Sequence, residues 1–334
     1  MKNNMFDIIT LGSATQDIMV RPKNLTVLKY GKSFNSGEGV CFPLGSKIDI
    51  DQIQFTTGGG GTNTAVTFAL QGFAAAFCGM IGKDISGQRI IDELQQLKVD
   101  VGLVVKTADA LTNHSIIITG DSQDKTILAY RGAGGLMGRV SIPWQKLKTK
   151  WLYLAPLTGL LCDSFGDLVD FAAAKNMKVA VNPSIAQLSL PVEKLRAVFQ
   201  KVAVLILNQE EASFLSKIPY EHEKEIFTKI GQLHPGITVM TRGGDGVVVS
   251  DGKFIYSAVP PKDRSIIDTT GAGDSFASGF LSDYIRTNGD IEKSIQLGMA
   301  NALGCLSEVG AKNGLLKKGQ EFEKVEVKKR EIVD

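Results

Sequence analysis

The sequence predicts an α/β fold in which helices cover both faces of a mostly parallel β-sheet. The chain has 334 residues, of which 43% are hydrophobic and 22% are charged, which is the composition of a globular protein with room for one large domain. Short apolar runs alternate with helical segments along most of its length. This alternation favours a parallel sheet, because each connection between parallel strands has to cross one face of the sheet.

Short runs rich in apolar and β-branched residues, bounded by turn-forming residues, predict the strands. They span residues 6–11, 75–80, 115–119, 126–130, 152–154, 179–181, 202–207, 237–240, 247–249 and 254–256. Apolar residues that repeat every three or four positions predict the helices. These span residues 62–70, 85–97, 164–175 and 291–306, and a further helix follows Asp274. No stretch rich in proline or serine divides the chain, so we expect a single domain over residues 1–334.

Two segments depart from this alternation. Residues 18–57 are rich in glycine, proline, lysine and serine, so we expect irregular structure there. Residues 112–131 contain two of the predicted strands, paired around a polar turn at 120–124. We expect residues 14–57 and 112–131 to form a lid beside the main sheet. From about residue 317 the chain is highly charged, and we expect this tail to fray.

Charge and cysteine content argue against several classes of protein. The 37 basic and 35 acidic residues leave a formal charge of +2 without a basic block, so we expect neither nucleic-acid nor membrane-surface binding. Residues 52–82 carry no charge, but glycines interrupt them too often for a membrane helix. Four scattered cysteines and an N-terminus without a signal-peptide pattern predict a reduced, cytoplasmic protein.

The segment Asp-Thr-Thr-Gly-Ala-Gly-Asp-Ser-Phe-Ala-Ser-Gly-Phe, residues 268–280, predicts an anion site. Gly271 and Gly273 let the backbone turn tightly, and unpaired N–H groups at the start of the following helix attract a phosphate. Asp274 would repel a bound anion, so its place there makes chemical sense if it takes a proton from an attacking hydroxyl. The alternative is that Asp274 simply caps the helix. The local pattern does not decide between the two.

The segment Gly-Gly-Gly-Gly-Thr-Asn-Thr-Ala-Val, residues 58–66, is a second candidate site. Four glycines before a helix leave room for a ligand, and Asn63 can hydrogen-bond sugar hydroxyls. Taken alone, a tightly packed turn is the more common explanation. The sequence contains no P-loop, no G-x-G-x-x-G and no G-x-S-x-G, so a P-loop enzyme, a dinucleotide fold and a serine hydrolase lack their fingerprints.

Together these motifs resemble those of the PfkB (ribokinase-like) carbohydrate kinases. Residues 58–66, followed by the glycines and aspartate of residues 79–84, are similar to the first signature of that family, and residues 268–280 to the second. Asn-Gln-Glu-Glu at 208–211 resembles the family's N-x-x-E motif, and Thr-Arg-Gly-Gly-Asp-Gly at 241–246 its T-x-G-x-x-G loop. The four motifs occur in the family's order.

The resemblance implies a ribokinase-like three-layer α/β/α sandwich with a small β lid. It also implies transfer of the γ-phosphoryl group of ATP, with Mg²⁺, to a hydroxymethyl group. The catalytic residues that it implies are Gly271, Ala272 and Gly273 as the anion hole and Asp274 as the base. The acceptor-binding residues are Asp17, Gly59, Gly60 and Asn63, and the ATP-binding residues are Asn208, Thr241, Gly243, Gly246 and Asn301. Glu211 would organise Mg²⁺ through water, and Asp268 with the carbonyl of Thr270 would hold a monovalent cation such as K⁺.

For Glu211 the residues alone allow an equally plausible alternative, a first-turn carboxylate that stabilises a helix N-terminus. For the acceptor, residues 58–61 are all glycine where ribokinases proper have Gly-Gly-Lys-Gly, which weakens the case for ribose. We expect a small free sugar. A nucleoside is the main alternative, because Phe34, Phe42 and Phe55 lie in the lid segment and aromatic rings stack on bases.

A sugar phosphate ranks lower, since a second phosphate needs paired basic residues and only Lys47 and Arg131 are candidates. A catalytically silent binding protein ranks lowest, because it has no need for Asp274 beside an anion site. Related proteins often dimerise through the lid, and the apolar fragments in residues 40–55 permit a homodimer here.

Overall fold

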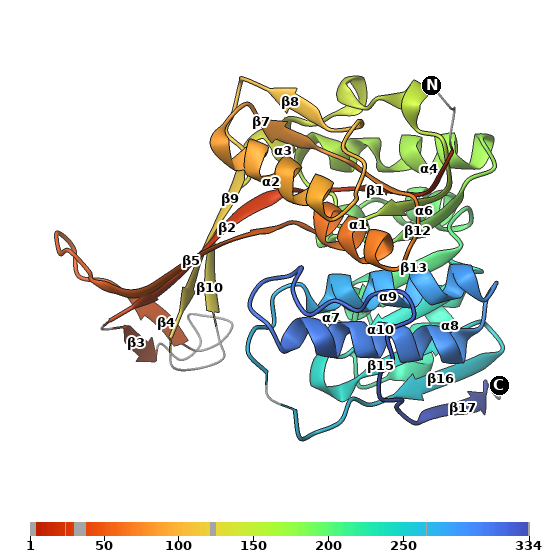
Figure 1. Ribbon diagram of the computed structural model, residues 1–334. Helices are drawn as coiled ribbons and strands as arrows, with labels where there is room; N and C mark the ends of the chain where they lie inside the picture. The colour runs from red at the N-terminus through yellow and green to blue at the C-terminus, as the bar shows by residue number, and fades with distance from the viewer. Residues whose placement is uncertain (1–4, 24, 30–37, 121–124, 265, 333–334) are drawn as a thin grey trace.

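The central sheet of the computed structural model, which describes residues 5–23, 25–29, 38–120, 125–264 and 266–332, lies between two layers of helices (Figure 1). Its strand order is β17-β16-β15-β14-β13-β12-β11-β1-β6. The parallel strands are β1 (Phe6–Leu11), β6 (Ala75–Cys78), β11 (Thr149–Leu154), β12 (Lys178–Val181), β13 (Val204–Asn208) and β14 (Ile237–Thr241). The antiparallel strands are β15 (Val247–Ser250), β16 (Phe254–Ala258) and β17 (Val327–Glu331). The predicted three-layer fold with a mostly parallel sheet is confirmed.

The C-terminal segment does not fray as expected. It supplies β17, which pairs with β16 in the register Ile255↔Arg330 and Ser257↔Lys328. Strand pairing uses backbone groups, and charged side chains are well suited to the exposed edge of a sheet, where they discourage pairing with another chain. The charge of this segment therefore marks an edge strand.

Alternate residues of the strands supply two cores. Ile8 on β1 packs in the cluster that contains Phe68 and Phe280, whereas Ile9 packs with Phe165 on the other face. The first face is covered by α1 (Gly60–Leu70), α9 (Ala272–Arg286) and α10 (Ile291–Leu306). The second is covered by α4 (Phe165–Ala174), α6 (Val192–Phe199), α7 (Gln209–Ser216) and α8 (Glu223–Gly231). The remaining helices are α2 (Ile85–Gln96), α3 (Gly132–Leu136) and α5 (Ile185–Leu188), with 3₁₀ helices at Arg139–Ser141, Trp144–Lys146, Gly159–Ser164 and Gly243–Asp245.

A second sheet projects from the body beyond β1 (Figure 1). Its order is β10-β9-β2-β5, formed by β2 (Thr15–Pro22), β5 (Ile50–Gly58), β9 (Asn113–Thr119) and β10 (Lys125–Tyr130). We call this sheet the lid. Short two-stranded sheets are formed by β3 (Thr26–Lys29) with β4 (Glu38–Cys41), and by β7 (Met80–Gly82) with β8 (Val105–Thr107).

The expectation of irregular structure over residues 18–57 is partly wrong. β2 and β5 pair along most of their length, with Asp17 opposite Thr56 and Met19 opposite Gln54. Each strand has only a weak apolar pattern, and it is the pairing with a distant segment that satisfies its backbone groups. Among the residues that the structure describes, no helix has both the length and the apolar character needed to cross a membrane.

The lid has two chemically different faces, because neighbouring side chains on a strand point to opposite sides. The inner face, directed at the body, carries the polar residues Arg21, Gln52, Gln54, Thr119 and Lys125 beside the apolar residues Met19, Ile117 and Ile127. The outer face includes Ile18, Val20, Ile53, Phe55, Ile116 and Leu128.

Candidate active site

The predicted site residues gather at the carboxyl edge of the parallel strands. Asn208 ends β13, Thr241 ends β14, and the loop after β1 leads directly into the lid at Thr15. Open parallel sheets bind their ligands at this edge, because the loops and helix N-termini converge there. The fold therefore brings the four sequence motifs to one side of the molecule.

The predicted anion site lies at the start of α9. Gly271 is the N-cap residue with φ of 79°, in the left-handed region that favours glycine. A Cβ on Gly271 would lie 2.8 Å from the Cα of Ala311, whereas a Cβ on Gly273 would meet nothing within 4 Å. The first N–H groups of a helix have no partner inside it and carry the positive end of its dipole. The turn from Gly271 through Ala272 to Gly273 thus has open space beside it and the electrostatics of an anion site.

Asp274 is the third residue of α9, and no side chain caps this helix. Its Oδ2 accepts a hydrogen bond of 2.9 Å from Nδ2 of Asn63 on α1. Burial raises the pKa of the Asp274 carboxyl, and the bond from Asn63 acts in the opposite direction. The capping alternative is therefore wrong. A carboxylate with a raised pKa next to an anion site suits proton transfer, which remains the prediction.

The glycines before α1 allow close backbone packing. Gly59 caps the helix with φ of 99°, and a Cβ there would lie 2.5 Å from the carbonyl oxygen of Ser13. A Cβ on Gly60 would lie 3.3 Å from Oδ1 of Asp274. Asn63 Oδ1 is buried and has no hydrogen-bond partner among the described residues. Since an unpaired buried acceptor is costly, the site has the polarity to receive a hydroxyl from a ligand.

Asp17 lies on β2 and is 6% exposed. A Cβ on Gly58 would overlap its carboxylate, so the first glycine of the motif makes room for Asp17. Burial is the main reason that the pKa of Asp17 is raised to about 6, against the effects of the Ser115 hydroxyl and the Lys312 ammonium. Asp17 is therefore mostly ionised at neutral pH and has the acceptor oxygens that sugar hydroxyls need.

Asn208 and Glu211 form a reciprocal capping box at the start of α7. Asn208 Oδ1 accepts a bond of 2.7 Å from the backbone N–H of Glu211, and Glu211 Oε2 accepts one of 2.8 Å from the N–H of Asn208. Burial raises the pKa of Glu211, and the charge of Glu210 adds to this. The alternative of a helix-stabilising carboxylate is thus confirmed for Glu211, and any role with a metal would be additional.

The residues fit a magnesium ion only as a partner of the nucleotide. In the described part of the chain, no three His, Cys, Asp or Glu side chains gather as a metal cage. Mg²⁺ keeps several waters and commonly binds one or two carboxylates together with substrate phosphates. Glu211, with one oxygen engaged in the capping box, has the donor chemistry for such a contact through water.

The loop between β14 and β15 is a tight turn at the same edge. The N–H of Arg242 bonds the carbonyl of Gly246 at 2.7 Å. Gly243 and Gly246 have φ of 54° and 88°, which favour glycine, and a Cβ on Gly243 would meet nothing within 4 Å. This turn leaves backbone exposed beside Thr241, where the sequence predicts the nucleotide.

Asn301 does not belong to this site. It is completely buried in α10, and its Nδ2 donates to the carbonyl of Ser275 at 2.7 Å. Its Oδ1 accepts from the backbone N–H of Leu316 at 2.9 Å. The side chain links α10 to α9 and to the following segment by hydrogen bonds. Because it is buried and both its amide groups are engaged, its assignment to ATP is wrong.

The predicted monovalent-cation site does not fit a bound K⁺. Lys125 Nζ lies 2.6 Å from Oδ1 of Asp268 and 2.7 Å from Oγ1 of Thr270. The carbonyl of Thr270 accepts a bond from Cys305 Sγ at 3.4 Å. The groups that were predicted to hold the ion are therefore engaged by donors of the protein itself.

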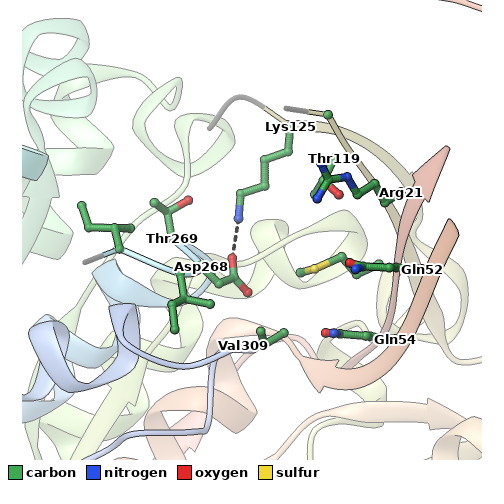
Figure 2. Close-up of a pocket in the computed structure, with 12 residues that line it drawn as sticks. Arg21, Gln52, Gln54, Thr119, Lys125, Asp268, Thr269 and Val309 are labelled. Carbon is green, nitrogen blue, oxygen red and sulfur yellow. Dashed lines mark hydrogen bonds and ion pairs between the residues drawn. The ribbon is translucent and has the colours of Figure 1, made fainter. Parts of the chain in front are cut away.

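A cavity of about 370 Å³ separates the inner face of the lid from the segment that leads into α9. Figure 2 shows Arg21, Gln52, Gln54 and Thr119 on the lid side, with Lys125 reaching across to Asp268. The lining is polar on the lid side, and Ile266, Ile267 and Val309 form the apolar part of the other wall. The cavity therefore has polar side chains on one wall that can hydrogen-bond a polar molecule.

Sequence patterns gave no sign of Lys125 or Lys312. Lys312 is 8% exposed and contacts both Thr57 and Glu93, next to the lid base, and Lys125 meets a residue 143 positions away. Neither lies in a motif, and such distant contacts become visible only in the fold.

Comparison with known proteins identifies the family of the chain. The model of the pfkB family carbohydrate kinases matches residues 37–318. A cytidine kinase of Thermococcus kodakarensis is 26% identical over 274 residues, which are 81% of this chain and 93% of that protein. A ribokinase of Lactococcus lactis is 25% identical over 326 residues, which are 94% and 95% of the two chains.

Among solved structures, that of Arabidopsis thaliana ribokinase complexed with ribose and ATP has a TM-score of 0.76 at 20% identity, covering 94% of this chain and 96% of that one. At this identity the likeness shows the fold. Because the family match extends over most of the sequence, the chain belongs to the pfkB family of carbohydrate kinases and is a phosphotransferase with an alcohol group as acceptor.

Proposed function

We propose that the protein is an ATP-dependent sugar kinase that transfers the γ-phosphoryl group to a hydroxymethyl group of a small sugar. One observation carries the proposal: the Asp274 carboxylate, whose pKa is raised, lies in the first turn of α9 next to the open space at Gly273 and accepts a hydrogen bond from Asn63, whose Oδ1 has no partner among the described residues. A proton acceptor, a phosphate site and an unsatisfied partner for a hydroxyl thus occur together.

In the proposed reaction, Asp274 takes the proton of the hydroxymethyl group as the hydroxymethyl oxygen attacks the γ-phosphorus of ATP, and the bond between that phosphorus and the leaving oxygen of ADP breaks. The N–H groups of Gly271, Ala272 and Gly273 stabilise charge on the transferring phosphoryl group. Asp17, with Gly59, Gly60 and Asn63, holds the sugar. Asn208, Thr241, Gly243 and Gly246 hold the nucleotide. Glu211 would hold Mg²⁺ through water, and the metal would supply positive charge that neutralises the phosphates.

A nucleoside acceptor loses part of its support. Phe55 pairs with Ile18 on the outer face of the lid, so its ring is turned away from the cavity. Phe34 lies outside the described residues, and Phe42 follows β4, away from the lining of the cavity. The relatives include both a cytidine kinase and a ribokinase at nearly equal identity, so nucleosides remain the second proposal.

A sugar-phosphate acceptor also has little support from the residues that the sequence suggested. Lys47 is exposed before β5 and Arg131 precedes α3, and neither lines the cavity. Arg21 does line it, so sugar phosphates belong among the acceptors to be tested.

We also propose that the protein is cytoplasmic, as the sequence predicts, because the proposed reaction needs ATP.

The acceptor is tested by ADP release with Mg·ATP across free sugars, sugar phosphates and nucleosides, with Asp274→Asn as the blank. Turnover on a free sugar that disappears in the blank supports the proposal. Turnover confined to nucleosides keeps the site and replaces the acceptor. ATP binding without turnover on any acceptor would favour a silent protein and contradict the proposal.

The pH dependence of acceptor binding is expected to report Asp17. Because the folded-state pKa of Asp17 is raised to about 6, lowering the pH through 6 protonates it and removes an acceptor of hydroxyl bonds. Binding should weaken by up to about tenfold per pH unit below 6. Calorimetric titration of the acceptor from pH 5 to pH 8 measures this.

Asp17→Asn separates this effect from the titration of Asp274. In that variant, binding should be weak at every pH and should lose the step near pH 6. A wild-type affinity that stays constant from pH 5 to pH 8 would show that Asp17 does not contact the acceptor.

We also propose a homodimer in which the outer faces of two lids pack together. Ile53, Phe55, Ile116 and Leu128 are between 39% and 53% exposed on this face. An exposed apolar patch of this kind marks an interface. Phe55→Asp is therefore expected to give a monomer in sedimentation velocity, because the new charge would be buried against the second copy.

Val140→Asp is the matched control, since Val140 is 98% exposed and lies in a 3₁₀ helix outside the four lid strands. It should leave the dimer intact. A wild-type monomer, or a Phe55→Asp protein that still dimerises, would refute this interface.

A further inference from the structure

Lys125 crosses from the lid to the body of the protein. It is the first residue of β10, and its Nζ lies 2.6 Å from Oδ1 of Asp268 and 2.7 Å from Oγ1 of Thr270 (Figure 2). The side chain of Lys125 is 18% exposed and that of Asp268 is 4% exposed. The ion pair is therefore largely removed from water, which strengthens its electrostatics and makes the loss of either partner costly.

Further donors form hydrogen bonds to the Asp268 carboxylate. Its Oδ1 also accepts bonds from the hydroxyl of Thr270 at 2.7 Å and from the backbone N–H of Thr270 at 2.9 Å. Its Oδ2 accepts one of 2.9 Å from the N–H of Gly310. Together with the Lys125 ammonium, these donors surround the Asp268 carboxylate, and among them Lys125 carries the positive charge.

The position of this pair gives it a consequence for the anion site. Asp268 precedes Gly271 by three residues, and Thr270 is directly bonded to Lys125. An unneutralised carboxylate here would repel a phosphate bound at Gly271–Gly273. A single positive charge removes this repulsion, and either a bound K⁺ or a primary ammonium group supplies it.

We propose that the Lys125 ammonium is a built-in substitute for a monovalent cation. It neutralises Asp268, orders the turn that leads into the anion site, and makes the enzyme independent of K⁺. Because Lys125 belongs to the lid, the same contact links the position of the lid to the order of the anion site. The effect on turnover rests on the proposed function of that site, whereas the effect on cation binding does not.

The test compares the wild type with Lys125→Ala in KCl and in tetramethylammonium chloride at equal ionic strength. Two quantities are measured: the melting temperature without ATP or acceptor, and the turnover rate with both. For the wild type, neither should respond to K⁺. For Lys125→Ala, the loss of the ammonium should lower both, and K⁺ should raise turnover at least about fivefold, the lower end of typical coupling between two sites. K⁺ should also raise the melting temperature of this variant.

Lys150→Ala is the matched control. Lys150 Nζ lies 2.8 Å from Oδ1 of Asp7, but this pair is exposed and remote from the site. The control should respond to K⁺ no more than the wild type. Lys125→Arg, which keeps the charge, should also remain independent of K⁺.

Activation or stabilisation of the wild type by K⁺ would overturn the proposal, whether or not Lys125→Ala folds. A folded Lys125→Ala protein that ignores K⁺ in both measurements would overturn it as well. If no acceptor turns over, the proposed function fails, and the melting experiment still decides whether Lys125 replaces the cation.

Discussion

Asp274→Asn is expected to reduce turnover by at least about 10², the usual contribution of a general base, while the protein remains folded. The replacement amide still offers an oxygen to Nδ2 of Asn63, so the contact between α9 and α1 is retained. What disappears is the ability to accept the proton of the hydroxymethyl group. Steady-state ADP release with saturating acceptor measures the loss.

The stability of Asp274→Asn should not fall with its turnover. The folded-state pKa of Asp274 is raised, so the carboxyl contributes stability that is present below its unfolded pKa and is lost as the pH rises through the folded one. At neutral pH the ionised group is therefore a cost, and Asp274→Asn should melt at or above the wild-type temperature. Asp283→Asn on the same helix, which removes a contact with Arg286, is the control and should keep full turnover. Near-normal turnover by a folded Asp274→Asn protein would exclude Asp274 as the base.

Gly273→Ala is expected to fold normally and to lose about 10²- to 10³-fold in turnover, because its methyl group would keep the phosphoryl group from the backbone N–H and the effect would equal the loss of one oxyanion donor. A Cβ at this position meets no protein atom within 4 Å, and alanine is a better helix former than glycine. The space that it would fill is the space that a phosphoryl group needs in order to approach the first turn of α9. Melting temperature and turnover together measure this separation of stability from activity.

Gly271→Ala is the comparison. Its Cβ would lie 2.8 Å from the Cα of Ala311 in a backbone conformation that favours glycine, so this variant should lose stability as well as activity. If Gly273→Ala retained wild-type turnover, the N–H groups at the start of α9 would not hold the transferring group.

Much of the fold could be predicted because its signals are local. The alternation of apolar strands with amphipathic helices depends on short segments, and most predicted elements coincide with those observed. Motif spacing was informative for the same reason. Asn208 and Glu211 form a capping box within one helical turn, and Asp84 caps α2 through the N–H of Gly87 at 2.7 Å. In both cases the hydrogen-bonded residues are three positions apart, so a short stretch of sequence predicts the contact.

The features that the sequence could not reveal depend on distant partners. β2 and β5 pair along a lid whose polar and apolar faces emerge only from that pairing. Asn301 has the polarity of a ligand-binding residue, but its partners Ser275 and Leu316 make it structural. Lys125 meets Asp268 across 143 positions, and no local pattern marks either as a pair. Tertiary contacts, rather than propensities, determine these roles.

The most direct test of the proposed reaction is to identify the bond that forms. Phosphorus–proton correlation NMR of the product mixture, with ADP counted in the same sample, shows which atom of the acceptor carries the new phosphate. Our account predicts one phosphate coupled to the protons of a CH₂ group for each ADP formed by the wild type, and none for Asp274→Asn. Release of ADP with an equal amount of free phosphate and an unchanged acceptor would contradict it.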